Sequence, residues 1–574
     1  MTAGFSGLET SARRAPCPAG ASRETTPSKR ADVVVVGGGL AGMMAAWTAA
    51  RSGARVILAD KARAGTSGPT AFAAGDILCW VPSEDNLQEW VDAYLEYGLG
   101  LNSASWVAAL LQGNHILVQR LVSEGFPVET DADGRWVRRS GRGPLVRCVL
   151  APMLQWQEAL RARCLKRGVT LMDRVAVERV LVDGGRAIGV AGFDVRTGEF
   201  HALMAPAVIL ATGGCSYRGP FFGQQVVAGE GLMMALEAGA SLAYMEYGNH
   251  YNVSLLRFPT YGQSKFMAHG GRYLNRHGEP FLTRREPGLG QRAVGNEAVR
   301  HMVEDVRAGN GPIYLDLSRF EEWELVRKLM PNLMLMLERA GVDLRRSPEP
   351  VIPAFTGTSN ASAAGIMIDS QGQTTLPGLF AAGDCACKGL VVGACIGVTG
   401  VSLAWANLTG HLAASSALQY AGQGHRVGAS PETLQHARQE LFAPLRRSAS
   451  GRPRDTLIEL SRLMGRVDVS LLRHEERLGR ALRRVRELKA ALAEAAGASD
   501  LHELMLWHEA ASSLACAEAT LLSALSRRET RGGHYREDDP ETDPLQASVI
   551  LAGLADGRLE IRRSSVGEEA PALP

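Results

Sequence analysis

Long apolar runs and clustered cysteines are both missing from this sequence of 574 residues. No apolar run reaches the roughly 18 residues that a membrane-spanning helix needs, so we expect no transmembrane segment. The nine cysteines are scattered and none forms a CxxC pair, which excludes the usual zinc-ribbon and iron–sulfur patterns and predicts no metal site. An odd number of cysteines in a large chain suits a reducing compartment, so we expect a cytoplasmic protein.

An excess of charge of one sign is missing as well. The 62 basic and 60 acidic residues leave a net charge of +2, which gives no electrostatic reason to expect a nucleic-acid partner. The length predicts roughly two to four domains. Residues 1–30 are rich in Ala, Ser, Thr, Pro and Arg, and no apolar segment follows the pair Arg13-Arg14. We therefore expect a disordered lead-in at residues 1–30 and no export signal.

The most informative stretch is a glycine-rich turn after a short apolar run. Val33–Val36 leads into Gly37, Gly39 and Gly42 with the spacing GxGxxG, and a helix-forming segment, 43–52, follows. The first glycine permits a tight turn, the second lets the backbone approach a pyrophosphate, and the third lets the helix pack close to the strand. The helix N-terminus adds free N–H groups and a positive dipole end. This pattern predicts a dinucleotide site, and the alternative is a turn that serves only packing.

An acidic residue at the expected distance supports that site. A second expected strand, 55–58, leads to Asp60, whose carboxylate can accept hydrogen bonds from a ribose hydroxyl pair. The segment 61–77 that follows is small and rich in Gly, Ser and Thr, so it can lie along a cofactor; the alternative is a plain surface loop. The residues of this segment that we expect to contact the cofactor are Lys61, Thr66, Ser67 and Thr70.

Two later strands also end in residues that allow a ligand to approach. The expected strand 207–211 closes with Thr212 and Gly213, and the expected strand from Leu379 closes with Gly383 and Asp384. The other expected strands are 169–172, 176–182 and 187–193, with a hairpin turn at 183–185, and 312–317. The expected helices are within 84–128, then 153–167, 229–239, 320–341, 431–446, 454–465, 468–496 and 501–527.

Six separated motifs then coincide in one order along the chain. They are GGGLAG, ATGG, GEGLMMALEAGASLAYMEY, GGRYLNRHGEPFL, PGLFAAGDCA and RRETRGGHYRED. Together they resemble the flavoprotein subunit family of succinate dehydrogenase and fumarate reductase, which includes L-aspartate oxidase and the alpha chain of adenylylsulfate reductase. The resemblance implies an α/β fold that binds FAD. Its Rossmann-type domain would come in two sequence pieces, 31–245 and 351–428, with an inserted α+β capping domain at 246–350 and a C-terminal helical domain at 429–574.

The same resemblance places the cofactor contacts and the mode of attachment. Thr212, Gly213, Gly383 and Asp384 fall on family motifs around the cofactor, and Ser402 falls near the serine at the flavin end. Family members with covalent flavin carry a histidine where this chain has Pro69 or its neighbour. We therefore predict non-covalent FAD.

The substrate residues of the dicarboxylate enzymes are changed. His250 lies one place early, Tyr251 takes the matching position, and Asn360 replaces a second histidine. The segment GACIGVTGVSL holds no arginine, although an arginine there clamps a substrate carboxylate in the family. Fumarate, succinate and aspartate are therefore doubtful substrates.

The catalytic candidates are Arg292 and His250. Arg292 falls where the family has its proton-shuttling arginine, although Ala293 replaces the aspartate that follows it, and His250 can contact a substrate. His269, Arg272, Arg531 and His534 fall on family motifs and are candidates for site contact or for a structural role.

These observations predict an FAD-dependent oxidoreductase that transfers hydride between a small-molecule substrate and the flavin. Because the chain has no second redox centre, electrons would pass to an iron–sulfur or ferredoxin-like partner, a soluble acceptor or oxygen. The alternatives are a sulfur enzyme similar to adenylylsulfate reductase, a non-catalytic flavoprotein that relays electrons, and an NAD-binding protein.

Overall fold

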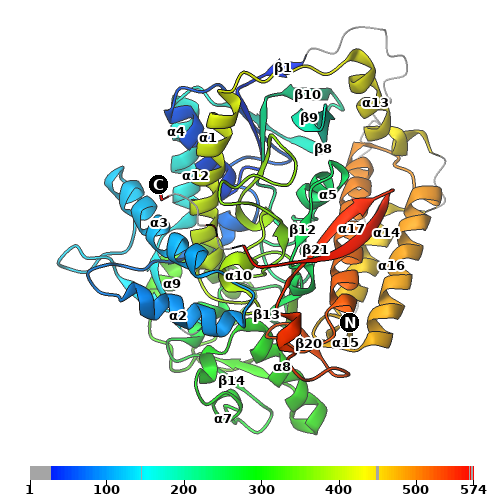
Figure 1. The fold of residues 1–574 in the computed structure, drawn as a ribbon. Coiled ribbons are helices and arrows are strands. Elements are labelled where there is room, and N and C mark those ends of the chain that lie inside the picture. Colours follow the sequence, from blue (N-terminus) through cyan, green and yellow to red (C-terminus); the bar gives the residue numbers. More distant parts are fainter. Residues whose placement is uncertain (1–27, 144, 448–450, 568, 570–572) are drawn as a thin grey trace, which may run out of the picture.

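The centre of the fold is a parallel sheet of five strands in the order β18-β11-β2-β3-β7 (Figure 1). The computed structural model describes residues 28–143, 145–447, 451–567, 569 and 573–574. The five strands are β2 (Val33–Val36), β3 (Val56–Asp60), β7 (Thr170–Asp173), β11 (Ala207–Leu210) and β18 (Leu379–Ala381). The carboxyl ends of parallel strands share one edge of a sheet, and this edge carries the groove described below.

Two helices pack together beside this sheet. Helix α1 (Leu40–Arg51) starts directly after the glycine turn, three residues before the expected 43–52, and its first turn is buried. Helix α12 (Val401–Ala421) lies against α1 and is buried along most of its length. Strand β2 is buried on both faces, which explains its uniform valine sequence. The two sequence pieces of the FAD-binding region therefore share one core.

A mixed sheet extends the first piece, in the order β1-β10-β9-β8, with β1 parallel to β10 and the other pairs antiparallel. Its strands are β1 (Lys29–Arg30), β8 (Val175–Asp183), β9 (Arg186–Asp194) and β10 (Phe200–Met204). The expected hairpin turn at 183–185 joins β8 to β9. Residues 29 and 30 pair with β10, so the disordered lead-in expected at 1–30 does not extend to residue 30. Residues 1–27 lie outside the described part of the chain.

The inserted region has a sheet of its own, in the order β13-β16-β15-β14. The strands are β13 (His250–Leu255), β14 (Arg272–Leu274), β15 (Tyr314–Asp316) and β16 (Glu349–Gly357), so the sheet runs past the expected end of the insert at 350. The helix expected over 320–341 is two helices, α9 (Trp323–Leu329) and α10 (Pro331–Arg339). The break falls at Pro331 because proline cannot donate the hydrogen bond that continues a helix.

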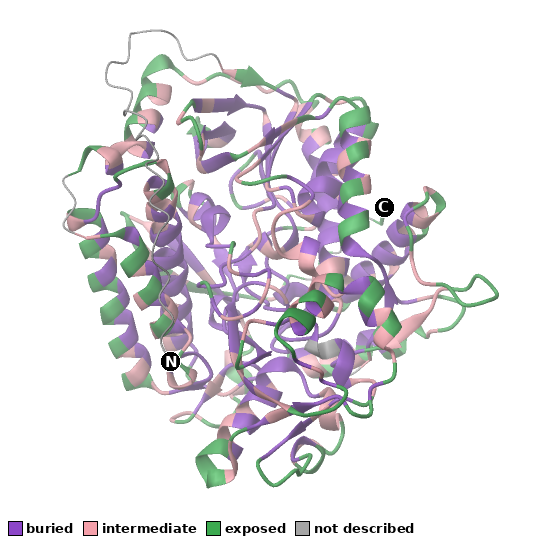
Figure 2. Cartoon of the chain, turned by 180° about the vertical axis from the view of Figure 1, so that it is seen from behind, coloured by how far each residue is buried: buried purple, intermediate pink, exposed green. Residues whose placement is uncertain are grey.

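The C-terminal region is helical but also contributes strands. Helices α14 (Pro453–Met464), α16 (Glu475–Ala495) and α17 (Leu501–Ser526) pack side by side, with α17 the most deeply buried (Figures 1 and 2). A hairpin of β21 (Val549–Ala555) and β22 (Arg558–Ser564) follows, which the sequence pattern did not predict. Strand β21 pairs with β12 (Leu242–Ala243) of the first FAD-binding piece.

The remaining helices and strands connect these units. The helices are α2 (Leu87–Gly98), α3 (Ala104–Ser123), α4 (Met153–Lys166), α5 (Glu230–Glu237), α6 (Gln263–Met267), α7 (Leu282–Arg285), α8 (Gly295–Asp305), α11 (Gly389–Val392), α13 (Pro431–Leu441) and α15 (Val467–Ser470). The short strands are β4 (Asp76–Leu78), β5 (Arg138–Ser140), β6 (Arg147–Leu150), β17 (Gly365–Ile366), β19 (Leu472–Arg473) and β20 (Tyr535–Arg536).

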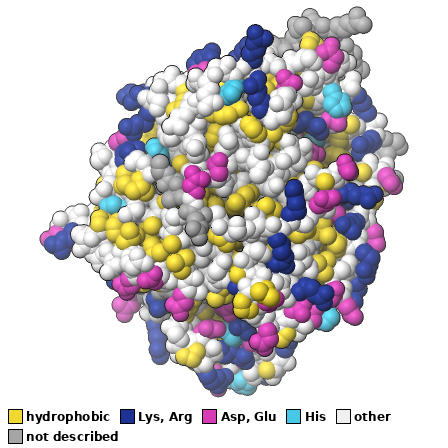
Figure 3. All heavy atoms as spheres, in the orientation of Figure 1, with side chains coloured by type: hydrophobic (Ala, Val, Ile, Leu, Met, Phe, Trp, Pro, Cys, Tyr) yellow, Lys and Arg dark blue, Asp and Glu magenta, His cyan; other side chains and the backbone are white. Residues whose placement is uncertain are grey.

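The surface mixes both signs of charge. Figure 3 shows acidic and basic side chains intermingled over the face that it presents, in keeping with the balanced composition. Within the described residues, none of the helices combines the length and the apolar character that crossing a bilayer requires.

Candidate functional site

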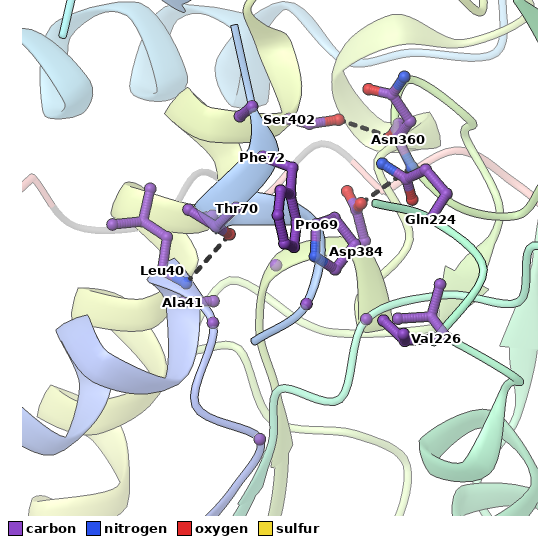
Figure 4. A pocket seen from close by; sticks show the side chains of 18 of the residues that line it. Leu40, Ala41, Pro69, Thr70, Phe72, Gln224, Val226, Asn360, Asp384 and Ser402 are labelled. Carbon is purple, nitrogen blue, oxygen red and sulfur yellow. Dashed lines mark hydrogen bonds between the residues drawn. The ribbon is translucent and has the colours of Figure 1, made fainter. Parts of the chain in front are cut away.

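A groove runs along the carboxyl edge of the central sheet and takes residues from both FAD-binding pieces (Figure 4). Eleven of the thirteen expected cofactor residues line it, namely Gly37, Gly39, Asp60, Lys61, Ser67, Thr70, Thr212, Gly213, Gly383, Asp384 and Ser402. Gly42 and Thr66 do not line it. Gly42 lies in the first turn of α1, and the hydroxyl of Thr66 is bonded locally to Arg63. The two regions expected to hold one cofactor therefore face one shared space.

The three fingerprint glycines differ in what surrounds them. A Cβ on Gly37, whose φ is +101°, would lie 2.4 Å from the carbonyl oxygen of Ala211, and one on Gly42 would lie 1.8 Å from that of Gly37. These two glycines are required by the turn and by helix–strand packing. A Cβ on Gly39 would meet only the hydroxyl of Thr70, at 3.6 Å. The fold leaves this position open toward the groove, as a close-approaching ligand requires.

Asp60 lies at the end of β3 beside this turn. One carboxylate oxygen accepts a hydrogen bond from the main-chain N–H of Gly38 at 2.7 Å, and the other accepts from Ala62 N–H and from the hydroxyl of Ser67. These contacts fix the carboxylate in the groove wall, where a ribose hydroxyl pair can reach it.

Lys61, the next residue, is held by two carboxylates. It forms ion pairs with Glu230 and, at 2.8 Å, with Glu509. Burial opposes its charge, but these two carboxylates outweigh burial and raise the pKa of Lys61. Lys61 therefore stays protonated, but the two carboxylates balance its charge. It brings no free positive charge to the groove.

Strand β18 and the residues that follow it supply the opposite wall of the groove. Asp384 accepts a hydrogen bond from the main-chain N–H of Asn360 at 2.9 Å and forms an ion pair with the buried Lys388 at 2.6 Å. The hydroxyl of Ser402 donates to the carbonyl of Asn360 at 2.5 Å (Figure 4). Helix α12 begins at Val401, so its positive end lies at this wall.

Strand β13 of the capping sheet brings His250 to the groove. The pairing of β13 with β16 shifts register between His250 and Tyr251. His250 lines the groove, whereas the hydroxyl of Tyr251 donates to the carbonyl of Gly465 in the C-terminal region. Successive side chains of a strand point to opposite faces, so His250 and Asn252 line the groove and Tyr251 between them does not.

His250 is neutral in this setting. Its Nδ1 lies 2.9 Å from the hydroxyl of Thr356. Burial first, and then the charges of Arg142 and Lys388, lower the pKa of His250 to about 3. Near neutral pH it can contact a substrate by neutral hydrogen bonding, and it holds no imidazolium proton to deliver.

The other expected catalytic residue, Arg292, is not among the groove residues. It ends a short 3₁₀ turn, Gly290–Arg292, and its carbonyl lies 3.4 Å from the N–H of Gly143. The arginine that does line the groove is Arg142, the residue before Gly143, which is only 1% exposed. A catalytic role for Arg292 stays a prediction that its placement does not support.

Arg142 is a groove residue that sequence reasoning missed. It belongs to no motif, and its place depends on the hairpin of β5 and β6, on Thr399 ahead of α12 and on Tyr273 of the capping sheet. Its main-chain N–H donates to the hydroxyl of Thr399 at 2.9 Å, and its Nη2 donates to the hydroxyl of Tyr273 at 2.8 Å. Only the folded chain brings these elements together.

The other candidates lie outside the groove and have structural partners. His269 contacts the carbonyl of Ser140 at 3.3 Å, and Arg272 forms an ion pair with Asp316. Arg531 forms an ion pair with Glu529, and His534 is fully buried, with Nε2 3.1 Å from the carbonyl of Arg527. These contacts favour the structural role over site contact for all four candidates.

A cluster of possible metal ligands lies elsewhere, in and near α8. Atoms of Glu286, Glu297 and His301 approach within 4.8 Å of one another. Arg300 forms an ion pair with Glu297 at 2.8 Å, and His301 bonds Glu286 at 2.6 Å, so the cluster pairs its own charges.

Comparison with known proteins agrees with this geometry. Residues 32–395 match the model described as "FAD binding domain", and residues 458–566 match "Fumarate reductase flavoprotein C-term". The chain is 29% identical over 582 residues to L-aspartate oxidase of Streptomyces coelicolor, and the alignment covers 95% of each chain. It is 28% identical over 543 residues to one component of the fumarate reductase (CoM/CoB) of Methanothermobacter marburgensis, covering 91% of this chain and 96% of that one.

Solved structures share the fold. A variant of the E. coli quinol fumarate reductase FrdA superposes with a TM-score of 0.85 at 24% identity, covering 95% of this chain and 98% of that chain. Adenylylsulfate reductase from Archaeoglobus fulgidus superposes with a TM-score of 0.79 at 22% identity, covering 95% and 97%. The expected fold class, a divided FAD-binding region with an insert and a C-terminal helical region, is confirmed.

Proposed function

The chain belongs to the FAD-binding family that includes the fumarate reductase flavoproteins, and we propose that this FAD-dependent oxidoreductase transfers hydride between a small substrate and non-covalent FAD. The observation that carries this proposal is the shared groove, in which Gly39 is left open for a ligand while Gly37 and Gly42 are explained by packing alone.

The residues that line the groove suit the successive parts of FAD. The main chain at Gly37–Gly39 and the N-terminus of α1 would hold the pyrophosphate, and Asp60 would hold the ribose of the ADP half. Asp384 and Ser402 would face the ribitol and flavin end. When bound, FAD supplies hydride transfer, and the protein's part is to position the substrate and exclude competing reactions.

The residues near the expected attachment point support a non-covalent cofactor. Pro69 begins the short 3₁₀ turn Pro69–Phe72 and lines the groove without a nucleophilic side chain. Of the described residues that line the groove, His250 is the only histidine, and none is a cysteine.

The residues at the positions where the family binds its dicarboxylate support a substrate other than fumarate or succinate. The segment Gly393–Leu403 lacks arginine, and Asn360 and Tyr251 stand where the sequence resemblance expects histidines. A carboxylate clamp of paired charged hydrogen bonds cannot be replaced by apolar side chains. We also propose an iron–sulfur or ferredoxin-like partner for electron transfer, because the sequence offers no CxxC pattern for a second redox centre of its own.

The test is anaerobic spectroscopy of the purified protein. We expect a yellow protein whose flavin is bleached by a substrate and recovers its colour with an electron acceptor. A colourless protein that binds NAD would contradict the proposal. A flavin spectrum that responds to a protein partner but to no small molecule would favour a protein that only relays electrons.

A further inference from the structure

Arg142 is the one unneutralised cation that the described part of the chain places in the groove. The residue is held from two sides, since its main chain is bonded to Thr399 and its Nη2 is bonded to Tyr273. Its Nε is buried and has no hydrogen-bond partner among the described residues. A buried charge that is left unpaired is costly, typically by several kcal/mol, so a fixed arginine of this kind indicates an anion that the protein itself does not supply.

The groups around Arg142 do not provide that anion. Burial raises the pKa of Tyr273, more than the charge of Arg142 lowers it, so the phenol stays neutral. Two of the groove carboxylates have cations of their own: Asp76 pairs with Lys265 at 2.7 Å, and Asp384 pairs with Lys388 at 2.6 Å. Both lysines are buried. The charge of Arg142 is therefore left for a ligand.

A second unpartnered donor lines the same groove. Asn252 is two residues after His250 on β13, and both residues line the groove. The side-chain amide Nδ2 of Asn252 is buried and has no partner among the described residues, as is the case for the Nε of Arg142. Two buried donors without partners, from different elements, therefore line one groove, and both are complementary to the oxygens of an anionic group.

We infer that Arg142 anchors the substrate of this oxidoreductase through one anionic group, with Asn252 as a second donor, and that the site selects a small organic monoanion over a dianion. This inference rests on the proposed function, because it places the anion in the same groove as the flavin. The other groove cation among the described residues, Lys61, is neutralised by Glu230 and Glu509, so one positive charge remains to be matched.

The experiment is a spectral titration of the FAD-loaded protein with propionate, propionamide and malonate. Propionate is a monoanion, propionamide has nearly its shape without the charge, and malonate is a small dianion. We expect propionate to perturb the flavin absorption saturably, propionamide to give no saturable change, and malonate to bind no more tightly than propionate.

Variants then assign the effect to Arg142. Arg142→Met is expected to raise the Kd for propionate at least tenfold, and Arg142→Lys is expected to recover part of the binding because it restores a charge without the fork of donors. Asn252→Ala is expected to weaken binding less than Arg142→Met. Arg135→Met is the matched control, because Arg135 is highly exposed in a loop. The Kd of this variant for propionate should equal that of the parent protein.

The FAD content of each variant separates the possible failures. Retained FAD in Arg142→Met shows a folded site in which the arginine does not hold the cofactor. Loss of FAD from both Arg142→Met and Arg142→Lys would overturn the inference, because the arginine would then serve the cofactor. Equal responses to propionate and propionamide, or more than tenfold tighter binding of malonate, would also overturn it. A parent protein without flavin would refute the proposed function before any titration.

Discussion

The hydroxyl of Thr70 accepts a hydrogen bond from the main-chain N–H of Leu40 over 3.3 Å, where α1 begins. The same hydroxyl is the single atom that a Cβ on Gly39 would meet, at 3.6 Å. The start of the helix and the segment after Asp60 thus enclose a space that no side chain of the turn fills. That relationship makes Gly39 a direct probe of cofactor binding.

Replacing Gly39 by valine should remove FAD while leaving the fold intact. The φ of Gly39 is −73°, which any residue adopts, so the added side chain enters the groove and meets the cofactor. We expect the absorbance ratio of flavin to protein to fall at least tenfold with an unchanged far-ultraviolet circular dichroism spectrum. Gly428→Val is the matched control, because Gly428 is exposed and a Cβ there meets nothing within 4 Å. A Gly39→Val protein that purifies yellow would contradict this placement.

Acid precipitation should release the flavin. Pro69 offers no atom for a covalent link, and His250 belongs to β13 of the capping sheet and not to the segment 61–77 in which the resemblance expects the covalent histidine. We expect trichloroacetic acid to leave intact FAD in the supernatant, identified by chromatography against an FAD standard. Flavin that remains bound to the pellet after washing would refute the non-covalent assignment.

Acidification should destabilise the protein in part through His250. Its pKa is about 3 in the folded state against an ordinary value near 6.5, so the unfolded chain binds the proton first as the pH falls. The stability that depends on neutral His250 is therefore complete above pH 6.5 and is lost progressively toward pH 3, by about 1.4 kcal/mol per pH unit.

The measurement compares the thermal midpoint at pH 7 and pH 5. We expect His250→Gln to lose less stability over this interval than the parent, by about 2 kcal/mol at pH 5. His436→Gln is the control, because His436 is highly exposed. Equal losses in the parent and His250→Gln would show that His250 is protonated to the same extent in both states.

Removing Arg527 should destabilise the junction between the C-terminal region and the start of the inserted region, where Glu246 lies. Its side chain is fully buried and pairs with Glu246 and Glu529 at 2.8 Å each, and both carboxylates are fully buried as well. Arg527→Leu leaves two buried carboxylates without this cation, a change of about 3–5 kcal/mol that we expect to lower the thermal midpoint by roughly 2–4 °C.

The neighbouring residue gives the control for this prediction. Arg528 is 65% exposed and pairs only with surface carboxylates, so Arg528→Leu should change the midpoint by about 1 °C or less. Circular dichroism of the two FAD-loaded variants makes the comparison. Similar midpoints for both would show that the buried arginine contributes no more than a surface ion pair.

The cofactor groove could be predicted from the sequence because its signals are local. Glycine spacing, a buried valine strand and an acid at the end of the next strand are imposed by short-range geometry, and the structure brings these residues together. The motif around Gly383 is likewise a strand end, and such ends meet at one edge of a parallel sheet. These features follow from the chain's local pattern before any long-range contact is known.

The substrate end could not be foreseen in the same way. Arg142 reaches the groove only because a hairpin, a helix start and the capping sheet converge on it, and no spacing within the sequence encodes that meeting. Which face of β13 turns to the groove, and hence that His250 lines it while Tyr251 does not, depends on how the capping sheet packs, and the strand's own pattern does not show this. The single helix predicted over 320–341 was wrong for a local reason that was present in the sequence, namely Pro331.

The pairing of β12 with β21 has a consequence for how the chain is made. Leu242 lies opposite Ala552, so β12 must wait for a partner strand that is translated much later, after all the helices of the C-terminal region. During synthesis from the N-terminus, that edge stays unsatisfied until β21 has left the ribosome. The pairing of β12 with β21 therefore forms late in biosynthesis. If translation ended ahead of β21, this edge of β12 would stay unpaired and could pair with strands of other nascent chains.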